Sequence, residues 1–580
     1  MNRKQRRAAQ TQLQEAVKGL RRAIALRPRD AQAHNELAVA LLHQGELEEA
    51  ASLFARAVAL MPELLEQYRN LVATLLKVNP ALRAGFARVA DAWPRELPDA
   101  EVLEQATAAA VLRDPLLRCM LEAGPVRDLN LERYLTRLRR LMLDLALGSS
   151  ANDKVDESTL EFCCALARQC FINEYVFAVS SQETEKASRL ADRLTQALNT
   201  ADAVSPLVPA AVGAYFPLYQ LEDSLANHDV DARNKSGHDG SEIGSVTSRA
   251  VSLLDRSWPA PVQSLLVQQV AEPKEERELR DGIVRITPIE NAVSVAVQRQ
   301  YEENPYPRWV TLPSDRGRMD LNHYLHQLLP AASFRELPST GGIDILVAGC
   351  GTGQQAIATA RRFTGARVLA VDLSLASLCY AKRMSGKLAA DNVDYAQADL
   401  LELASLPRAF DLIEASGVLH HLADPPAGWS VLLKLLRPGG FMHVGLYSRS
   451  ARGQIRAARE FFAEKGVVAS PEGIRQWRGA LLSTPMRSVA DYADFFTTSE
   501  CRDLLFHVQE HQLTIPEIDA FLRRHDLAFI GFELPPQSSA SYRFRFPEDR
   551  RMANLAYWDV FEKENPATFA SMYQFWVQKP

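Results

Sequence analysis

Three glycines in the stretch 349–353 stand directly after an apolar run that is typical of a buried strand. Without a Cβ, Gly349, Gly351 and Gly353 let the backbone turn sharply, approach a ligand and begin a helix with free N–H groups. A second expected strand ends at Asp372, 19 residues after Gly353, where a carboxylate can accept hydrogen bonds from both hydroxyls of a ribose. This spacing predicts a nucleoside-containing ligand at the ends of two parallel strands.

Two further strands are expected to end at the same edge of the sheet. The strand expected over 393–400 ends with Asp399 and Leu400. The acid can accept from the amino group of an adenine while the apolar side chain covers its ring. The next strand begins at 410 and reaches Ser416, at the point where the strand order should reverse. Four strand ends are thus expected to contribute to one site.

In order and spacing these motifs resemble the class I S-adenosyl-L-methionine (SAM)-dependent methyltransferases. The resemblance covers residues 341–448 motif by motif, through GCGTG, Asp372, AD, VLHHL and RPGG. A dinucleotide dehydrogenase is the alternative, but GCGTG differs from its G-x-G-x-x-G fingerprint and the later motifs favour the methyltransferase. The resemblance implies a Rossmann-like, seven-stranded α/β domain over 341–580, with insertions at 449–513 and 535–571, and S-adenosyl-L-homocysteine as the product. It also implies a set of cofactor-binding residues: Gly349, Cys350, Gly351, Thr352, Gly353, Asp372, Leu373, Asp399, Leu400 and Ser416.

One position departs from the family pattern. The acid that usually stands two residues before the first glycine is replaced by Val347, so another group must bind the methionine end of the cofactor. The segment Asn304–Trp309, sequence NPYPRW, could fold over the cofactor with Tyr306 and Arg308 at its carboxylate. A rigid proline-rich connector is the competing interpretation.

Methyl transfer from a sulfonium needs mainly positioning and exclusion of water, so a general base is optional. His420 and His421 lie in the loop where a neutral imidazole could take the acceptor's proton, or they cap the strand and shape the pocket. His507 and His511 lack the spacing of an HExxH zinc site and a third ligand. They are expected to line the acceptor site or make fold contacts, and no metal is predicted.

The elements that must position this site belong to a multidomain chain of 580 residues. A 34-residue register of alanines and prolines, clearest over 31–62, resembles tetratricopeptide repeats and predicts helical pairs. We therefore expect an α plus α/β architecture. Before the methyltransferase domain the expected segments are repeats over 1–97, an irregular helical domain over 98–225, a flexible polar linker over 226–250 and a helical connector over 251–340. The apolar cluster 169–177 is assigned to the core of the helical domain.

The bulk composition excludes several classes of protein. A net charge of −5 and a pI near 6.2 do not favour nucleic acid. Charged residues interrupt every apolar run, so no membrane span is expected. The N-terminus lacks the apolar stretch of a signal peptide, and the seven cysteines show no disulfide framework. A cytoplasmic protein is predicted.

The sequence leaves the acceptor and the oligomeric state open. Because tetratricopeptide arrays generally bind peptide segments, the leading hypothesis is methylation of a protein or peptide recruited by the repeats. The first alternative is a small-molecule methyltransferase that uses the repeats for assembly. The second is an interaction protein whose cofactor site is inactive, which only Val347 supports.

Overall fold

The computed structural model describes residues 3–61, 68–92, 95, 97–98, 105–221, 248–312, 317–338 and 341–580. Its N-terminal part consists of antiparallel helices with these bounds: α1 Arg3–Leu26, α2 Ala31–Gln44, α3 Leu47–Leu60, α4 Tyr68–Val78 and α5 Pro80–Ala92. The Asp30 side chain accepts from Ala33 N–H to begin α2, and Gly45 ends it at φ 86°. Ala50 and Ala57 are fully buried, as expected where two helices approach closely.

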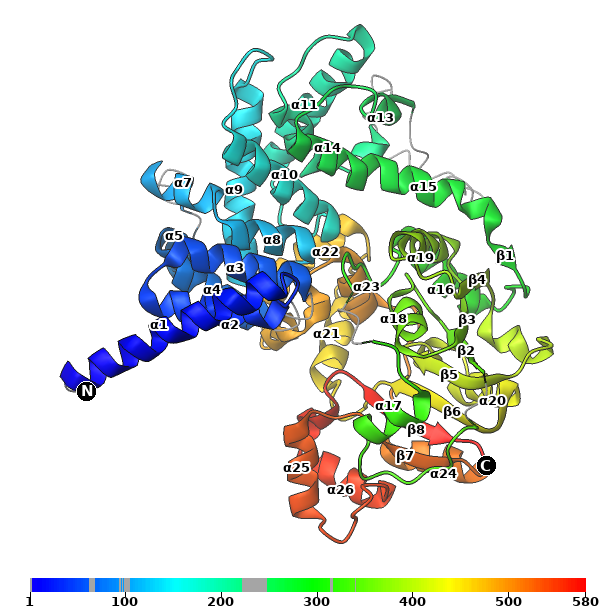
Figure 1. Ribbon diagram of the computed structural model, residues 1–580. Helices are drawn as coiled ribbons and strands as arrows, with labels where there is room; N and C mark the ends of the chain where they lie inside the picture. The colour runs from blue at the N-terminus through cyan, green and yellow to red at the C-terminus, as the bar shows by residue number, and fades with distance from the viewer. Residues whose placement is uncertain are drawn as a thin grey trace.

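The next helices continue the same hydrophobic core without the repeat register. Their bounds are α7 Gln105–Leu112, α8 Pro115–Ala123, α9 Leu129–Gly148, α10 Glu157–Ile172, α11 Ser181–Thr200 and α12 Leu207–Gly213. Most of the cluster 169–177 is buried, in agreement with its assignment to the core. The repeats and the helical domain therefore form one continuous helical layer (Figure 1).

Most of the linker expected over 226–250 lies outside the described residues, and the described chain resumes at Ser248. The connector contains a short run of helices and one short strand before the sheet: α13 Ser248–Ser252, α14 Ala260–Leu266, the π-helical turn Val267–Ala271, α15 Glu272–Glu278, β1 Val284–Arg285, α16 Ala292–Glu303 and α17 Leu321–Leu328. Among the described residues no helix is both long and apolar enough to cross a bilayer.

The C-terminal part is built on one sheet with the order β1-β4-β3-β2-β5-β6-β8-β7. Its strands after β1 are β2 Ile343–Ala348, β3 Ala366–Asp372, β4 Val393–Gln397, β5 Phe410–Ser416, β6 Leu436–Leu446, β7 Ala528–Phe532 and β8 Tyr573–Gln578. The strands β1 to β6 run parallel to one another, and β8 runs antiparallel to both β6 and β7.

The sheet has eight strands where seven were expected. The extra strand is β1, in which Val284 pairs with Ala396 and Arg285 with Gln397. The connector thereby uses main-chain groups at the outer edge of β4 that would otherwise be unpaired. This correction adds one strand at the edge of the sheet.

Helices cover both faces of the sheet (Figure 1). One face packs against α17, α18 Gln354–Arg362 and α19 Leu375–Lys387. The other packs against α20 Pro425–Leu435, α24 Ile515–Arg524 and α26 Leu555–Glu564. The central parallel strands β2, β3 and β5 are largely buried on both sides and accordingly read as nearly continuous apolar runs. The Ser180 and Thr514 capping boxes begin α11 and α24.

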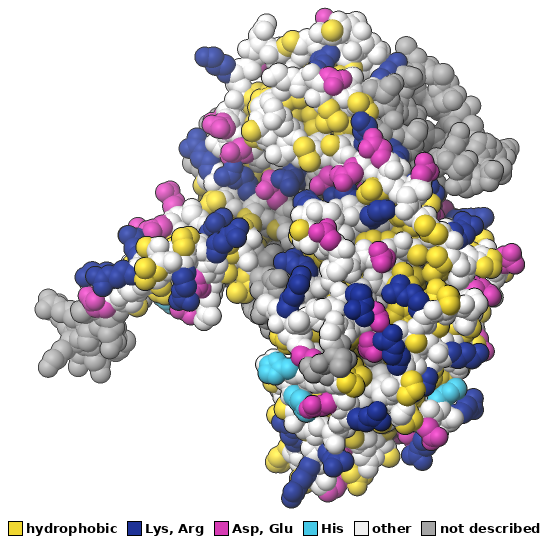
Figure 2. All heavy atoms as spheres, turned by 45° about the vertical axis from the view of Figure 1, so that its right-hand side comes forward, with side chains coloured by type: hydrophobic (Ala, Val, Ile, Leu, Met, Phe, Trp, Pro, Cys, Tyr) yellow, Lys and Arg dark blue, Asp and Glu magenta, His cyan; other side chains and the backbone are white. Residues whose placement is uncertain are grey.

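Both insertions are helical. The first contains α21 Gly453–Glu464, α22 Pro471–Leu481 and α23 Thr498–Phe506, and the second contains α25 Pro536–Arg545 and α26. The first joins the sheet domain to the helical layer, because Arg478 Nη2 lies 3.0 Å from a Glu132 carboxylate oxygen on α9. Figure 1 shows α22 and α23 between the two halves of the chain. Figure 2 shows side chains of both charge signs dispersed over one face of the molecule.

Candidate active site

A cavity of about 260 Å³ opens at the carboxyl ends of β2 to β5. The structure brings most of the sequence-predicted residues together on its walls: Gly349, Cys350, Gly351, Asp372, Leu373, Asp399, Leu400, Ser416, Tyr306 and His421. These residues follow four different strands or lie in the connector. The cavity therefore depends on the parallel arrangement, which places all four strand ends at one edge.

The glycine-rich turn has no room for side chains. Gly351 has φ 51°, and a Cβ built there would lie 2.4 Å from the carbonyl oxygen of Tyr306. That carbonyl also accepts from Thr352 N–H at 3.1 Å, and Trp309 Nε1 donates to Thr352 O at 3.1 Å. The NPYPRW segment thus lies directly over the turn, with Tyr306 and Pro307 on the cavity wall.

Asp372 ends β3 with its carboxylate at the cavity. Its two oxygens accept from Gly351 N–H at 2.8 Å and from Ser374 N–H at 2.9 Å. Burial raises the pKa of this carboxyl to about 6, even though both main-chain hydrogen bonds favour the ionised form. Each carboxylate oxygen can accept a second hydrogen bond, so two further donors can be held.

Asp399 lies two residues after the end of β4 and is held by hydrogen bonds of its main chain and its side chain. Asp399 N–H donates to Thr287 Oγ1 at 2.7 Å, and the side chain accepts from Leu401 N–H at 3.0 Å. The acid and Leu400 both line the cavity. An anionic oxygen next to an apolar wall suits an adenine, which has a polar edge and two apolar faces.

Three of the predicted cofactor contacts do not line this cavity. Thr352 and Gly353 turn into the fold, where Thr352 Oγ1 donates to Pro307 O and Gly353 precedes α18. Arg308 points toward the helical layer, with its guanidinium 4.8 Å from the ring centroid of Phe171 and 5.5 Å from that of Tyr380. A planar guanidinium stacks well on aromatic faces, and the structure places Arg308 there instead of at the cofactor's carboxylate.

The structure also adds wall residues that the sequence reasoning missed, among them Tyr301, Gln354, Gln355 and Met572. Gln354 and Gln355 begin the helix after the glycine turn, so their place could have been read from the motif. Val347 is buried within β2, beside Glu414 in the register. Glu414 does not replace the missing acid, because its carboxylate accepts from Thr359 at 2.7 Å inside the fold.

The two adjacent histidines have different surroundings. His420 is fully buried and its ring stacks on Tyr447 with centroids 3.9 Å apart. His421 lines the cavity, and its Nδ1 lies 2.8 Å from the carbonyl oxygen of Gln509. None of the described residues hydrogen-bonds to His421 Nε2. Burial lowers the pKa of His421 below its usual value, so this imidazole is neutral near pH 7.

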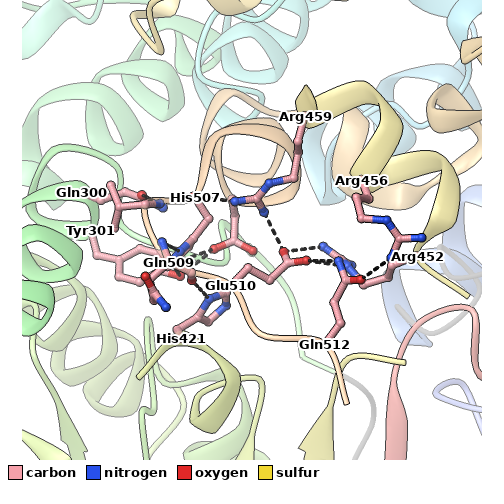
Figure 3. Close-up of polar contacts among 12 residues, drawn as sticks. Gln300, Tyr301, His421, Arg452, Arg456, Arg459, His507, Gln509, Glu510 and Gln512 are labelled. Atoms are coloured by element: carbon pink, nitrogen blue, oxygen red, sulfur yellow. Dashed lines mark hydrogen bonds and ion pairs between the residues drawn. The ribbon is translucent and has the colours of Figure 1, made fainter. Parts of the chain in front are cut away.

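A polar network from the first insertion surrounds His421 (Figure 3). The rings of His421 and His507 are stacked with centroids 3.7 Å apart. His507 and His511 do not line the cavity themselves, and His511 contacts the Gln509 side chain at 2.8 Å. Glu510 is held by ion pairs with two arginines of the insertion, Arg452 at 2.8 Å and Arg459 at 2.7 Å.

His421, Asp503 and His507 cluster closely enough to raise the question of a metal ion. The hydrogen bonding of His507 argues against a metal ion bound to this residue, because Gln509 N–H donates to His507 Nδ1 at 3.0 Å. In the neutral ring the proton is then on Nε2, the nitrogen that lies 3.9 Å from Asp503. A metal-bound imidazole usually donates through its other nitrogen, which His507 cannot do here.

Comparisons with known proteins agree with this geometry. A family model for a methyltransferase domain matches residues 346–442, and one for a tetratricopeptide repeat matches residues 5–63. An uncharacterized protein of Synechococcus sp. is 34% identical over 257 residues, which are 42% of this chain and 60% of the relative. The match thus spans less than two thirds of that relative.

Two further proteins are similar to parts of this chain. The trans-aconitate 2-methyltransferase of Deinococcus radiodurans is 28% identical over 33% of this chain and 72% of its own length. The structure of PKMT2 from Rickettsia typhi in complex with AdoHcy aligns with a TM-score of 0.34 and 18% identity, over 46% of this chain and 54% of that one. By the family models and the curated relatives, this chain combines an N-terminal tetratricopeptide repeat with a C-terminal SAM-dependent methyltransferase domain.

Proposed function

We propose that the protein transfers the methyl group of SAM to an acceptor held at the His421 end of the cavity. The observation that carries this proposal is that one cavity joins Asp372 and Asp399 to His421. The residues fit the cofactor, because Asp372 retains free acceptor positions for ribose hydroxyls and Asp399 can accept from an adenine amino group. The glycine turn offers main-chain groups to the methionine end, where Tyr306 takes part in place of an acid at 347.

When bound, SAM supplies a methyl group on a positively charged sulfur that is already a good leaving group. The protein's part is positioning and exclusion of water. Tyr301, Tyr306 and Met572 form an apolar wall near the methyl end, and Tyr301 and Tyr306 stack with centroids 6.1 Å apart. Of the two histidines, His421 is the candidate for direct contact with the acceptor, and His420 supports the loop by packing.

For the acceptor we retain a protein or peptide recruited through the repeats. The support is the continuity of the structure: the repeats share a core with the helical layer, and α9 of that layer is ion-paired to the insertion that surrounds His421. The alternative is a small-molecule acceptor, which the curated relative named as a trans-aconitate methyltransferase favours. The third reading, a cofactor-binding protein without activity, rests on Val347 alone.

Labelled SAM incubated with the purified full-length chain and cell lysate tests all three. Label in the macromolecular fraction supports a protein acceptor, and label confined to small molecules supports the alternative. Saturable SAM binding with label in neither fraction supports an inactive domain. The Asp372→Ala variant is the matched control, since its weaker cofactor binding should lower incorporation at SAM concentrations that do not saturate it.

A further inference from the structure

The main chain of one residue, Gln509, contacts both imidazoles beside the cavity. Its carbonyl oxygen lies 2.8 Å from His421 Nδ1, and its N–H lies 3.0 Å from His507 Nδ1. A carbonyl only accepts hydrogen bonds and an N–H only donates them. His421 must therefore carry its proton on Nδ1, with a lone pair on Nε2, while His507 carries its proton on Nε2.

His507 has the opposite tautomer to His421, and its Nε2–H is therefore linked through a hydroxyl to the buried side chain of Asp503. His507 Nε2 donates to the Tyr301 hydroxyl at 3.1 Å, and that hydroxyl donates to Asp503 Oδ1 at 2.5 Å. Asp503 is 3% exposed, so its charge is poorly screened by water. The ligand atoms of Asp503, His421 and His507 all lie within 4.8 Å of one another. A buried carboxyl group thus stands beside the His421 imidazole, which lines the cavity.

We infer that His421 Nε2 is the base that takes a proton from the acceptor, and that Asp503, held by Tyr301 and His507, is a positioning residue that stabilises the resulting imidazolium. The inference rests on the proposed methyl transfer and defines its substrate class: the acceptor atom is a hydroxyl oxygen or an amine nitrogen that carries a proton. An acceptor atom that carries no proton does not need a general base, so a histidine with its lone pair fixed on Nε2 would not assist its methylation.

The step balances without any further reactant. The acceptor oxygen or nitrogen bonds to the methyl carbon, the carbon–sulfur bond breaks with its electron pair going to sulfur, and the acceptor's proton passes to His421 Nε2. Both histidines must be neutral beforehand, and burial lowers the pKa of each below its usual value.

Other charged and titratable groups also act on His421. Asp503 and Glu510 raise its pKa, whereas Arg452 lowers it. The neutral rings of His420 and His507 flank it. Because Glu510 is paired with Arg452 and Arg459, its charge is already balanced. Asp503 has no arginine or lysine partner within ion-pairing distance among the described residues, so its charge is available to the imidazolium.

The tautomers can be read without substrate or activity. In solid-state ¹⁵N spectra of the full chain labelled at histidine, His421 should show a protonated Nδ1 and His507 a protonated Nε2, with assignments from His421→Asn and His507→Asn. A protonated Nε2 on His421 overturns the inference. Zn²⁺ binding that requires His507 overturns it as well, since a metal needs the lone pair of Nε2.

The role of Asp503 is tested with Asp503→Asn, which keeps the acceptor for Tyr301 but removes the charge. With labelled SAM and lysate, we expect SAM affinity to stay within twofold of wild type, incorporation to fall about tenfold at saturating SAM, and the acid limb of its pH profile to move to lower pH. Asp519→Asn, which changes a partly exposed acid of α24 that pairs with Arg523, is the control and should leave all three unchanged. Wild-type rate and pH profile in Asp503→Asn overturn the inference. Absence of incorporation by the wild type instead refutes the proposed function, and the ¹⁵N spectra still decide the tautomers.

Discussion

Removal of the Asp372 carboxylate should weaken SAM binding by about 30-fold. Two of its acceptor positions are used by Gly351 and Ser374, and the remaining ones can take both ribose hydroxyls. A hydrogen bond to a charged group contributes about 1.5–3 kcal/mol net. Since the ribose gives up hydrogen bonds to water on entering the site, we take about 2 kcal/mol for the pair, which corresponds to about 30-fold at 1.4 kcal/mol per tenfold.

Isothermal titration calorimetry of Asp372→Ala with SAM measures this loss directly. The substitution also leaves two main-chain N–H groups of the turn without their acceptor, so the melting temperature is recorded to confirm that the variant is folded during the titration. Asp394→Ala, an exposed acid on the neighbouring strand, is the control and should bind like wild type. A Kd for Asp372→Ala equal to that of wild type would refute the assignment of this residue to the ribose.

Three further predictions follow from the same structure. The pKa of Asp372 is raised to about 6, and its ionised form accepts the ribose hydroxyls. The Kd for SAM should therefore be constant above pH 7 and increase as the pH falls through 6. A Kd that does not change between pH 5 and 8 would contradict this. Gly351→Ala should abolish SAM binding and lower the melting temperature, since its Cβ meets the carbonyl oxygen of Tyr306, whereas Gly386→Ala, with open space around it, should be neutral or slightly stabilising. Arg478→Met should cost about 3–5 kcal/mol in chemical denaturation by leaving Glu132 buried and unpaired. Arg545→Met, which breaks an exposed ion pair screened by water, should leave the stability nearly unchanged. Equal effects of the two substitutions would argue against the buried pair.

Much of the candidate cofactor site could be predicted from residues that are close together in the sequence. Glycines at positive φ, an acid at the end of a strand and capping residues at helix starts act through their own backbone, so their types and spacing are visible in the chain. Asp372, Asp399 and the glycine turn accordingly lie where the motif order placed them. The α/β class of the C-terminal domain was also predictable, because strands that alternate with helices favour a parallel sheet.

The acceptor side depended on contacts between residues far apart in the chain. Tyr301 and Asp503 are 202 positions apart, and His421 and Gln509 are 88 apart. No local pattern marks a main-chain carbonyl that selects one tautomer of a distant histidine, and the same applies to the aromatic faces that hold Arg308 away from the cavity. The sequence alone predicted a nucleoside site over the glycine turn. Only the tertiary structure decided which histidine faces it and in which protonation state, because that state depends on hydrogen-bond partners that folding brings together.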